Sequence, residues 1–335
     1  MKLLVTGGAG FIGTNFVRRW CRLHPDDELV VLDKLTYAGC RENLDGLPIR
    51  FVEGDICDAP TALAAMDGCA QVVHFAAESH VDRSLYGGAE FLNTSVFGTW
   101  TLLEAARQVG VERFLMISTD EVYGPVPSGH SLESDELKPS SPYAASKVAA
   151  DRLAFSYFVT HKLPVLITRS SNNYGPYQYP EKQLPFFTTQ ALDGQPLPIY
   201  GDGGACRDWL HVDDNCAGIE TVLRAGVPGE VYNIGADNQR SILDNARLIL
   251  DELGQSESLL SFLANESIRP GHDVRYSVAS SKLHALGWRP TVDVEFGLRA
   301  TVRWYAEHRP WWEMMRARSK EFFARHYGAR IAAKG

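Results

Sequence analysis

The feature that most constrains the fold is a glycine-rich turn near the start of the chain. Residues 2–7 read KLLVTG, which predicts a buried strand, and residues 14–23 read TNFVRRWCRL with helical apolar spacing. Between them lie Gly7, Gly10 and Gly13. These positions suit a dinucleotide site, where the first glycine allows the tight turn, the second admits a pyrophosphate and the third lets helix and strand pack closely. Free N–H groups at the helix start would face the phosphates.

The alternation of strand and helix signals continues through the first half. Further strands are predicted at 28–33, 49–55, 70–78, 113–118 and 164–170, and long helices at 89–109 and 143–161. Continuous apolar strands that alternate with helices indicate a parallel sheet covered on both faces. We therefore expect an α/β fold: a Rossmann-type, doubly wound parallel sheet with a smaller C-terminal α/β substrate-binding domain.

The rhythm changes after Ser170. Residues 171–185 and 196–209 are rich in Gly, Pro and Tyr and are predicted to be long loops, whereas 213–225 and 241–253 have helical spacing. The expected division is a cofactor-binding domain at 1–170, to which 208–235 returns, and a mainly substrate-binding domain at 171–335.

Composition narrows the possible partners. The chain has 335 residues and a net charge of −8, which argues against nucleic acid or an anionic membrane as a partner. No apolar run is long enough to span a bilayer, and the first residues lead directly into a strand without a signal peptide. Six scattered cysteines without a CxxC pair favour neither a disulfide framework nor a metal site. A cytoplasmic location is predicted.

Asp33 ends the second predicted strand, where a carboxylate can bind the adenosine ribose hydroxyls. Because that carboxylate would repel a 2′-phosphate, NAD is favoured over NADP, although the neighbouring Lys34 could tolerate the phosphate. The alternative is a glycine-rich turn with a solvated aspartate. The order of strand, glycines, helix and aspartate favours the cofactor site.

Tyr143 and Lys147 occur in YAASK, four residues apart on a predicted helix, and therefore share one face. An ammonium group near a phenol is expected to lower the phenol pKa from about 10, and the charge of bound NAD⁺ would add to this effect. Such a phenol can accept a proton from a substrate hydroxyl while hydride leaves the same carbon. The pair alone is common on surface helices, but the upstream dinucleotide turn favours the catalytic interpretation.

Two adjacent carboxyl groups, Asp120 and Glu121, follow Thr119 at the end of the predicted strand 113–118. They could form a solvated or capped strand end. However, ligands of open α/β sheets bind at the carboxyl ends of the strands. Two carboxyl groups at the end of a buried strand cost free energy, which favours a functional role for them. Neighbours in a strand point to opposite faces, so both can reach one ligand only if the strand ends near Thr119 and the backbone turns.

Several longer motifs carry a family resemblance. They are HFAAESHVDRS, STDEVYG, SPYAASK, NNYGPYQYPEK, RDWLHVDD, YNIG, RPGHDVRY, LGWRP and a closing TVRWY…WW. Together they resemble the extended short-chain dehydrogenase/reductase family over nearly the whole chain. The Asp-Glu pair resembles its nucleotide-sugar 4,6-dehydratases more closely than its epimerases.

The resemblance implies a reaction cycle on a nucleotide sugar, with dTDP-glucose expected and the choice between thymidine and uridine left open. Tyr143 would take the C4 hydroxyl proton, with Thr119 bonded to O4. Glu121 would then remove the C5 proton, and Asp120 would protonate the departing C6 hydroxyl. Return of hydride to C6 and reprotonation of C5 would give a 4-keto-6-deoxy product, with the departed hydroxyl released as water. The alternatives are another nucleotide-sugar dehydratase, an epimerase or a decarboxylase on the same fold, and a non-catalytic NAD-binding regulator or scaffold.

The resemblance also implies a wider site. Besides the three glycines, Asp33, Lys34, Tyr143 and Lys147, the expected cofactor residues are Phe11, Ile12, Leu35, Thr36, Asp55, Ile56, Phe75, Ala76, Ala77, Thr94 and Asn173. The expected substrate residues are Ser79, Thr119, Asn172, Lys182, Gln183, Pro198, Ile199, Tyr200, Arg207, Asn233, Arg269 and His272. Lys182, Arg207 and Arg269 are the candidates for the diphosphate.

A homodimer is expected, in which helices 89–109 and 143–161 pair with their copies. The chain also departs from the family pattern at Cys40, Ser95, Ser170, Gln183 and Ala236. None of these positions belongs to the proposed catalytic set, so we expect them to affect cofactor fit and nucleotide recognition rather than the reaction.

Overall fold

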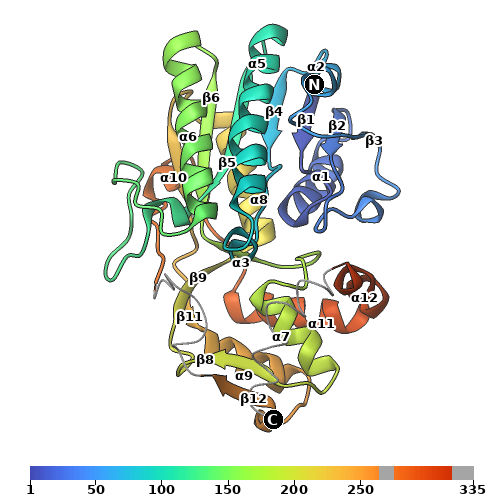
Figure 1. Cartoon of the computed structure of the whole chain (residues 1–335), viewed down its shortest axis with the longest axis vertical. Coiled ribbons are helices and arrows are strands. Elements are labelled where there is room, and N and C mark those ends of the chain that lie inside the picture. The colour runs from blue at the N-terminus through green and yellow to red at the C-terminus, as the bar shows by residue number, and fades with distance from the viewer. Residues whose placement is uncertain (264–274, 319–335) are drawn as a thin grey trace.

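The computed structural model describes residues 1–263 and 275–318. Within these residues, a parallel sheet of seven strands has the order β3-β2-β1-β4-β5-β6-β10 (Figure 1). The strands are β1 (Lys2–Thr6), β2 (Glu28–Asp33), β3 (Ile49–Glu53), β4 (Gln71–His74), β5 (Arg113–Thr119), β6 (Val165–Ser170) and β10 (Val231–Ile234). The six strands predicted in the first half are all present, and the doubly wound α/β fold is confirmed.

Helices cover both faces of the sheet. The helices α1 (Phe11–Leu23) and α8 (Val212–Ala225) pack on one face, and α2 (Ala59–Met66), α5 (Thr99–Val109) and α6 (Pro142–His161) pack on the other. The strand residues alternate accordingly. Leu3 and Val5 belong to the first core cluster and Leu4 to the second, because successive side chains of a strand point to opposite faces. This explains why the strands read as continuous apolar runs.

The single helix predicted at 89–109 is divided in the structure. A short helix α4 (Gly88–Leu92) leads into a π-helical segment (Asn93–Gly98) and then into α5. Ser95 lies in the π-helical segment, where it is buried and its hydroxyl accepts a hydrogen bond from Ser146 of α6 at 3.3 Å. The spacing of apolar residues alone did not reveal this change of helical type.

The second half holds more regular structure than the sequence predicted. The supposed loops contain β7 (Asn172–Tyr174), α7 (Gln183–Leu192), β8 (Leu197–Tyr200) and β9 (Cys206–His211), so that part of the prediction is wrong. The second half also contains the short strands β11 (Gln239–Ser241) and β12 (Leu260–Leu263) and the helices α9 (Ile242–Glu252), α10 (Ser281–Ala285) and α11 (Val294–Glu307). Proline and glycine between these elements hid them, because strands of three to six residues give weak periodic signals.

The chain passes more than once between an upper layer, which is the seven-stranded sheet with its covering helices, and a lower layer (Figure 1). β10 comes from the second half of the sequence but pairs in parallel with β6 of the large sheet. The lower layer in Figure 1 contains α7, α9 and α11 with the short sheets, packed around their own apolar cluster. The boundaries 1–170 with 208–235, and 171–335, remain a prediction.

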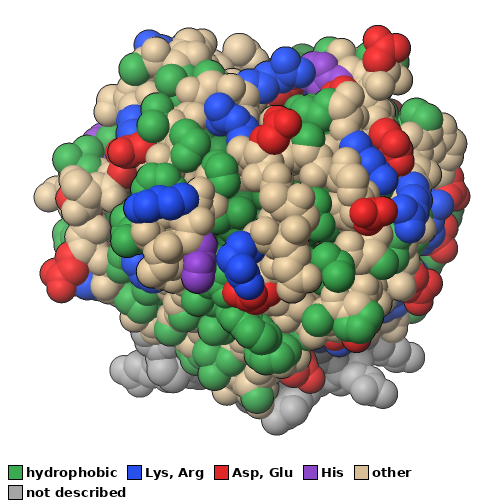
Figure 2. Space-filling view, turned by 90° about the horizontal axis from the view of Figure 1, so that it is seen from above, with side chains coloured by type: hydrophobic (Ala, Val, Ile, Leu, Met, Phe, Trp, Pro, Cys, Tyr) green, Lys and Arg blue, Asp and Glu red, His purple; other side chains and the backbone are tan. Residues whose placement is uncertain are grey.

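Charged side chains of both signs are mixed on the surface. On the face shown in Figure 2, Lys and Arg side chains are interspersed with Asp and Glu, without a large area of one sign. In the part of the chain that the structure describes, no helix has the length and apolarity needed to cross a bilayer.

Candidate active site

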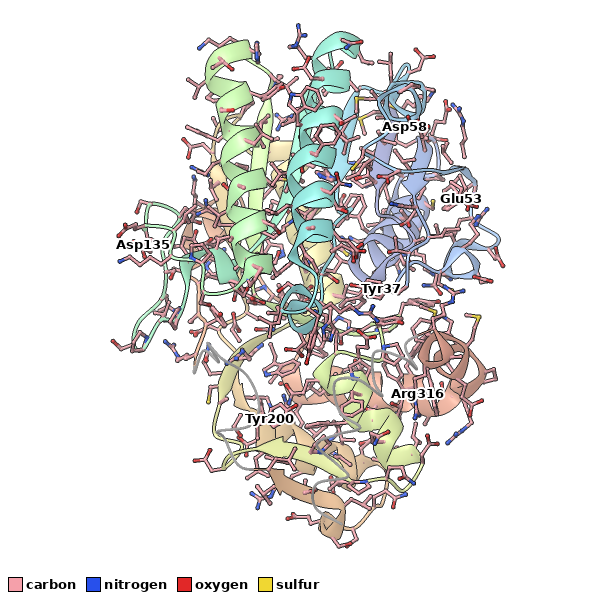
Figure 3. All side chains as sticks on the ribbon, in the orientation of Figure 1. Tyr37, Glu53, Asp58, Asp135, Tyr200 and Arg316 are labelled. Atoms are coloured by element: carbon pink, nitrogen blue, oxygen red, sulfur yellow. The ribbon has the colours of Figure 1, made fainter. Side chains whose placement is uncertain are left out.

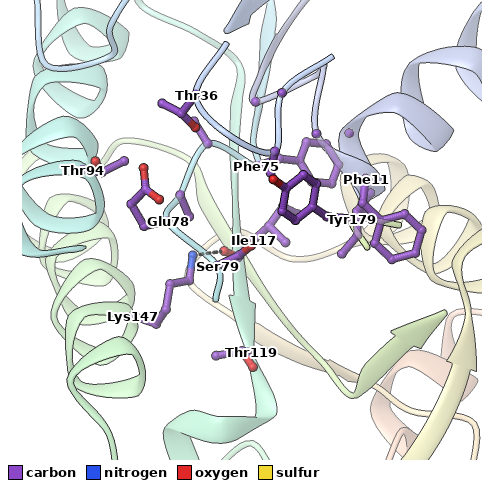
Figure 4. Close-up of a pocket in the computed structure, with 18 of the residues that line it drawn as sticks. Phe11, Thr36, Phe75, Glu78, Ser79, Thr94, Ile117, Thr119, Lys147 and Tyr179 are labelled. Atoms are coloured by element: carbon purple, nitrogen blue, oxygen red, sulfur yellow. Dashed lines mark hydrogen bonds between the residues drawn. The ribbon is translucent and has the colours of Figure 1, made fainter. Parts of the chain in front are cut away.

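One pocket collects most of the residues predicted from the sequence. It lies where the glycine turn, the carboxyl ends of β2, β4, β5 and β6, and the first turns of α6 meet (Figures 1 and 4). The predicted residues that line it are Gly7, Gly10, Phe11, Ile12, Gly13, Asp33, Lys34, Thr36, Asp55, Ile56, Phe75, Ala76, Ala77, Ser79, Thr94, Thr119, Asp120, Glu121, Tyr143, Lys147, Asn172, Asn173 and Lys182.

The glycine turn has the geometry that a dinucleotide needs. Gly7 has a φ of +71°, and a Cβ there would lie 2.5 Å from the backbone nitrogen of Ala76. A Cβ on Gly13 would lie 2.2 Å from the carbonyl oxygen of Gly7, so the close approach of α1 to β1 requires glycine. At Gly10 the nearest atom would be 3.4 Å away, which leaves the N-terminal end of α1 open to a phosphate. These residues fit a bound dinucleotide.

Asp33 is held rigidly at the edge of this pocket. Its two carboxylate oxygens accept hydrogen bonds from the backbone N–H groups of Ala9, at 2.9 Å, and Leu35, at 2.8 Å. Burial raises the pKa of Asp33, and these two hydrogen bonds oppose that effect. Remaining lone pairs of the carboxylate can accept from ribose hydroxyls.

The cation next to Asp33 is already paired. The Lys34 ammonium lies 2.6 Å from the Asp55 carboxylate, so its charge is shared with a second acidic group of the pocket. This end of the pocket therefore holds two carboxylates, Asp33 and Asp55, and the cation of Lys34, which is paired with Asp55. That balance disfavours a 2′-phosphate and agrees with a preference for NAD.

The start of α6 fixes the positions of Tyr143 and Lys147. The Ser141 hydroxyl accepts a hydrogen bond from the Ala144 N–H, and Pro142 occupies the first turn, so the helix begins immediately before Tyr143. Lys147 is buried one turn later. Its ammonium donates a 2.7 Å hydrogen bond to the carbonyl oxygen of Ile117 in β5 (Figure 4). Burial lowers the pKa of Lys147 to about 8, and the nearby Asp151 carboxylate acts in the opposite direction.

The pKa of Tyr143 differs from the sequence-based expectation. We expected Lys147 to lower it, but in the protein alone burial raises it, with further increases from the charges of Glu121 and Asp120. A hydrogen bond with Thr119 acts in the opposite direction. The expectation was wrong because the Lys147 ammonium is bonded to the β5 backbone, while two carboxyl groups lie near the phenol.

Thr119 ends β5, and the backbone then enters a 3-10 turn (Asp120–Tyr123), as the carboxyl pair requires. The Thr119 hydroxyl caps this turn: it accepts a 3.3 Å hydrogen bond from the Glu121 N–H and donates one of 3.3 Å to Asp120. Because the strand stops here, the two carboxyl groups are released from strand alternation and both line the pocket.

Asp120 is in an environment that favours its protonated form. Its side chain is buried, and within the described residues its Oδ2 atom has no hydrogen-bond partner. Burial raises the pKa of Asp120 well above 3.8, and the charges of Glu121 and Asp208 raise it further, while Arg207 lowers it. A carboxyl group that keeps its proton can act as a general acid.

Several predicted residues lie outside the pocket lining. Leu35 contributes its N–H to Asp33, and its side chain packs against the core. Pro198, Ile199 and Tyr200 form β8 in the lower layer, where Ile199 is fully buried (Figure 3 labels Tyr200). These side chains were predicted from the resemblance alone, and the structure does not bring them to the pocket. Arg269 and His272 lie outside the described residues.

Arg207, Gln183 and Asn233 are also outside the pocket lining, for different reasons. The Arg207 guanidinium lies 5.2 Å from the centre of the Tyr276 ring, yet its charge still acts on Asp120. Gln183 begins α7, directly after Lys182. Asn233 is fully buried and its amide is used internally: it accepts from the Tyr123 hydroxyl at 2.8 Å and donates to the Ser131 carbonyl at 3.1 Å.

Sequence reasoning did not select several residues that line the pocket. They are Leu32, Ala38, Gly39, Gly54, Glu78, Ile117, Ser118, Ser171, Gln178 and Tyr179, whereas Ser170, which also lines the pocket, was noted from the sequence only as a departure from the family pattern. Glu78 and Tyr179 stand inside motifs that carried the resemblance, and Ile117, Ser118 and Ser170 stand at carboxyl ends of strands. The rule that ligands bind at these ends was the signal that could have found the strand residues.

A Tyr–Lys helix beside a glycine-turn pocket, on a doubly wound parallel sheet, defines an enzyme of the extended short-chain dehydrogenase/reductase class. Within that class, the chain belongs to the GDP-mannose 4,6 dehydratase family, whose family model matches residues 4–301.

Individual relatives agree with this assignment. The chain is 50% identical over 309 residues to the low-salt glycan biosynthesis protein Agl12 of Haloferax volcanii, covering 91% of this chain and 98% of the relative. It is 47% identical over 326 residues to a dTDP-glucose 4,6-dehydratase of Streptomyces niveus, covering 95% and 96%. The crystal structure of DesIV, a dTDP-glucose 4,6-dehydratase of Streptomyces venezuelae with NAD bound, aligns with a TM-score of 0.91 at 50% identity, covering 94% and 100%.

Proposed function

We propose that this enzyme is a hydro-lyase that converts dTDP-glucose to dTDP-4-keto-6-deoxyglucose and water, with NAD as a bound cofactor. The observation that carries the proposal is the 3-10 turn at the end of β5, which brings Asp120 and Glu121 into the same pocket as Tyr143 and Lys147. Oxidation at C4 alone needs no second acid–base pair, whereas loss of water from C5 and C6 needs one acid and one base.

The first half of the cycle is assigned to Tyr143, Lys147 and Thr119. Tyr143 removes the proton of the C4 hydroxyl, and Thr119, which hydrogen-bonds the phenol, holds the substrate oxygen. When bound, NAD⁺ accepts hydride from C4 and later returns it to C6. Its positive charge would offset the effect of the two carboxyl groups on Tyr143. Lys147, held against the Ile117 carbonyl, presents a cation to the cofactor side of the pocket.

The elimination is assigned to the adjacent carboxyl groups. The 4-ketone acidifies the C5 hydrogen, which Glu121 removes as the general base. Asp120 donates its proton to the C6 hydroxyl as it leaves as water. Once hydride has been added to C6, a proton is returned to C5, which completes the 4-keto-6-deoxy product. The environment of Asp120, which raises its pKa, supports this division of roles between two carboxyl groups that are close enough to split their titrations.

Substrate contacts are proposed for the pocket residues nearest to these groups. Ser79, Asn172 and Lys182 line the pocket, and the Lys182 ammonium donates a 2.8 Å hydrogen bond to the Ser79 carbonyl oxygen. Lys182 and Arg207 are proposed for the diphosphate because Lys182 lines the pocket and the positive charge of Arg207 acts on Asp120. Relatives named as acting on dTDP-glucose support thymidine as the base.

The competing activity is epimerization on the same fold. A UDP-glucose 4-epimerase of Thermus thermophilus aligns with a TM-score of 0.85 at 31% identity, covering 92% of this chain and 100% of that chain. The test is to incubate the purified enzyme with dTDP-glucose and, separately, UDP-glucose, and to record the product mass. We expect dTDP-glucose to lose one water. A product of unchanged mass would contradict the proposal.

We also propose a homodimer built from the outer surface of α4, α5 and α6. Leu92, Trp100 and Val159 are exposed large apolar residues on these helices, and Phe97 is another in the π-helical segment between α4 and α5. The ring centroids of Phe97 and Trp100 are 5.2 Å apart. The helices α5 and α6 stand side by side in Figure 1. Sedimentation should give a dimer, and Trp100→Glu should give a monomer. A monomeric wild-type protein would contradict the proposal.

The domain division and the location are proposed on similar grounds. The separate apolar cluster of α7, α9 and α11 supports a substrate domain that packs on the cofactor domain. All six cysteines are free, which fits a reducing cytoplasm.

A further inference from the structure

The loop that follows β2 forms one wall of the cofactor pocket. We call residues 36–43 the cofactor loop. Thr36, Ala38 and Gly39 line the pocket, and a Cβ on Gly39 would lie 3.0 Å from the Asp33 carboxylate. The Cys40 N–H donates a 3.0 Å hydrogen bond to the carbonyl oxygen of Ala9 in the glycine turn. Any movement of this loop would therefore disturb the adenosine side of the site.

The helix α12 (Arg309–Ala317), the last helix of the described residues, lies against the same loop. The indole Nε1 of Trp311 donates a 2.7 Å hydrogen bond to the side-chain oxygen of Asn43. Directly after the helix, Arg318 donates from Nη1 to the Gly39 carbonyl oxygen at 2.7 Å. Figure 3 labels Tyr37 on the loop and Arg316 on the helix below it. Two hydrogen bonds thus join segments that are more than 260 residues apart in the sequence.

An apolar cluster fills the contact between α12 and the cofactor loop. Cys40, Tyr179 and Met315 are buried together, and Tyr37, Ala38, Trp311 and Met314 pack against them. Tyr179 also lines the pocket, so this cluster lies directly behind the cofactor wall. The cluster accounts for Cys40, one of the departures from the family pattern, because a small apolar thiol is well suited to a fully buried position.

The helix α12 is itself fixed to the lower layer. The Trp312 indole donates to the Tyr305 carbonyl oxygen at 2.9 Å, and the rings of Trp304 and Trp311 are in contact at 5.1 Å. Arg309 and Arg316 both pair with the Asp193 carboxylate, at 2.8 and 2.6 Å. Because these contacts fix α12 to the lower layer, α12 restrains the cofactor loop and does not move with it.

We propose that α12 is a clamp that retains the dinucleotide: Trp311 and Arg318 act as positioning residues that hold the cofactor loop closed over its adenosine half. Release of NAD would then require these contacts to break. Trp311 belongs to the WW pair of the closing motif TVRWY…WW, which has no part in the proposed chemistry. The clamp gives this motif a role in cofactor retention. The inference rests on the proposed function only in requiring NAD as the cofactor, and not on the sugar reaction.

The test measures cofactor exchange rather than activity. Purified holoenzyme is mixed with excess isotopically labelled NAD⁺, and the loss of the original NAD⁺ is followed over time. Trp311→Phe keeps an aromatic ring but removes the indole N–H, and Arg318→Ala removes the bond to Gly39. Loss of one such hydrogen bond should accelerate release by about 3- to 10-fold in each variant. Arg318 is exposed, so that variant remains informative if Trp311→Phe fails to fold.

A matched control separates retention from general stability. Trp288→Phe removes another buried indole hydrogen bond, from Nε1 to the Asp214 carbonyl oxygen at 3.0 Å, away from the cofactor loop. It should exchange NAD⁺ at the wild-type rate. Affinity for thymidine diphosphate should be unchanged in Arg318→Ala. Wild-type exchange in both clamp variants, or equally fast exchange in Trp288→Phe, would overturn the clamp. Either result leaves the dehydratase assay unaffected.

Discussion

Arg169 donates a 2.8 Å hydrogen bond from Nη1 to the hydroxyl of Tyr123. Tyr123 closes the 3-10 turn that carries both carboxyl groups. The same guanidinium binds the Asp151 carboxylate, from Nε at 2.9 Å, and Asp151 lies one helical turn after Lys147 on α6. Arg169 and Asp151 are both fully or almost fully buried. A buried polar connection therefore joins the acid–base turn to the helix of the Tyr–Lys pair.

Tyr123→Phe should weaken that connection without removing any pocket group. The Arg169–Asp151 ion pair remains, but the turn loses the hydroxyl that bonds Arg169 and Asn233. We expect kcat to fall by about 10- to 100-fold with little change in KM, because small displacements of acid–base groups are costly. Steady-state kinetics test this. Tyr232→Phe, which removes a buried hydroxyl bonded to the Val227 N–H at 2.9 Å, is the control and should keep wild-type kcat.

Tyr143→Phe should retain NAD and the fold but lose the first step. General-base catalysis is worth about 10²- to 10⁴-fold, so turnover of dTDP-glucose should fall by that factor. Tyr157→Phe alters the same helix at a hydroxyl bonded to Glu104, and should remain active. Nearly normal turnover in Tyr143→Phe would place the oxidising base elsewhere.

The two carboxyl variants should fail at elimination and not at oxidation. Glu121→Gln should still form reduced nicotinamide with dTDP-glucose, visible by absorbance, but should incorporate little solvent deuterium at C5. Asp120→Asn should also oxidise the substrate and release water slowly, because an amide is a poor proton donor. Glu136→Gln, a surface carboxylate paired with Lys138, is the control. Wild-type C5 labelling by Glu121→Gln would remove Glu121 from the role of base.

The raised pKa of Asp120 also predicts a pH-dependent stability. A buried carboxyl group with a pKa well above 3.8 keeps its proton in the folded protein and loses it on unfolding. Its folded state is therefore favoured at low pH and loses that advantage as pH rises above 3.8 toward the folded pKa. Relative to wild type, Asp120→Asn should gain about 1.4 kcal/mol in free energy of unfolding per pH unit in this window. Urea unfolding at pH 5, 6 and 7 measures it, and a constant difference would mean that Asp120 is ionised when folded.

Asp33 should determine the choice of dinucleotide. Asp33→Ser removes a carboxylate that can bind two ribose hydroxyls, so NAD⁺ affinity should fall by about 10- to 100-fold while NADP⁺ binding improves or is unchanged. Equilibrium binding to the apoenzyme tests both. Glu53→Gln alters a carboxylate at the β3 position in register with Asp33 of β2, and this exposed position lies outside the pocket (Figure 3). This control should keep the NAD preference. Equal loss of NAD⁺ affinity in both variants would mean that general negative charge, rather than a ribose contact, is responsible.

Local sequence was sufficient for the cofactor half of the enzyme. A Cβ atom on Gly7 or Gly13 would lie only 2.5 or 2.2 Å from backbone atoms, so glycine is required at both positions. This requirement appears in the sequence as glycines at a fixed spacing. Five of the six first-half strands were recognised because both of their faces are buried, which makes them largely apolar, whereas β3 is an edge strand with exposed Arg50 and Glu53. The end of β5 at Thr119 followed from the adjacency of two carboxyl groups that a continuous strand would have placed on opposite faces.

The tertiary structure decided what depends on distant segments. The pKa of Tyr143 is raised by burial and by the carboxyl groups near the phenol. Lys147 is only four residues away in the sequence, but its ammonium donates a hydrogen bond to the backbone of β5. Asn233 was directed into the core because Tyr123 and Ser131 occupy its amide. The contact of Trp311 with Asn43 joins two segments that are 268 residues apart in the sequence. Residue spacing encodes the local backbone and one face of an element, whereas electrostatic environment and long-range contacts arise only when elements pack, and no local pattern records them.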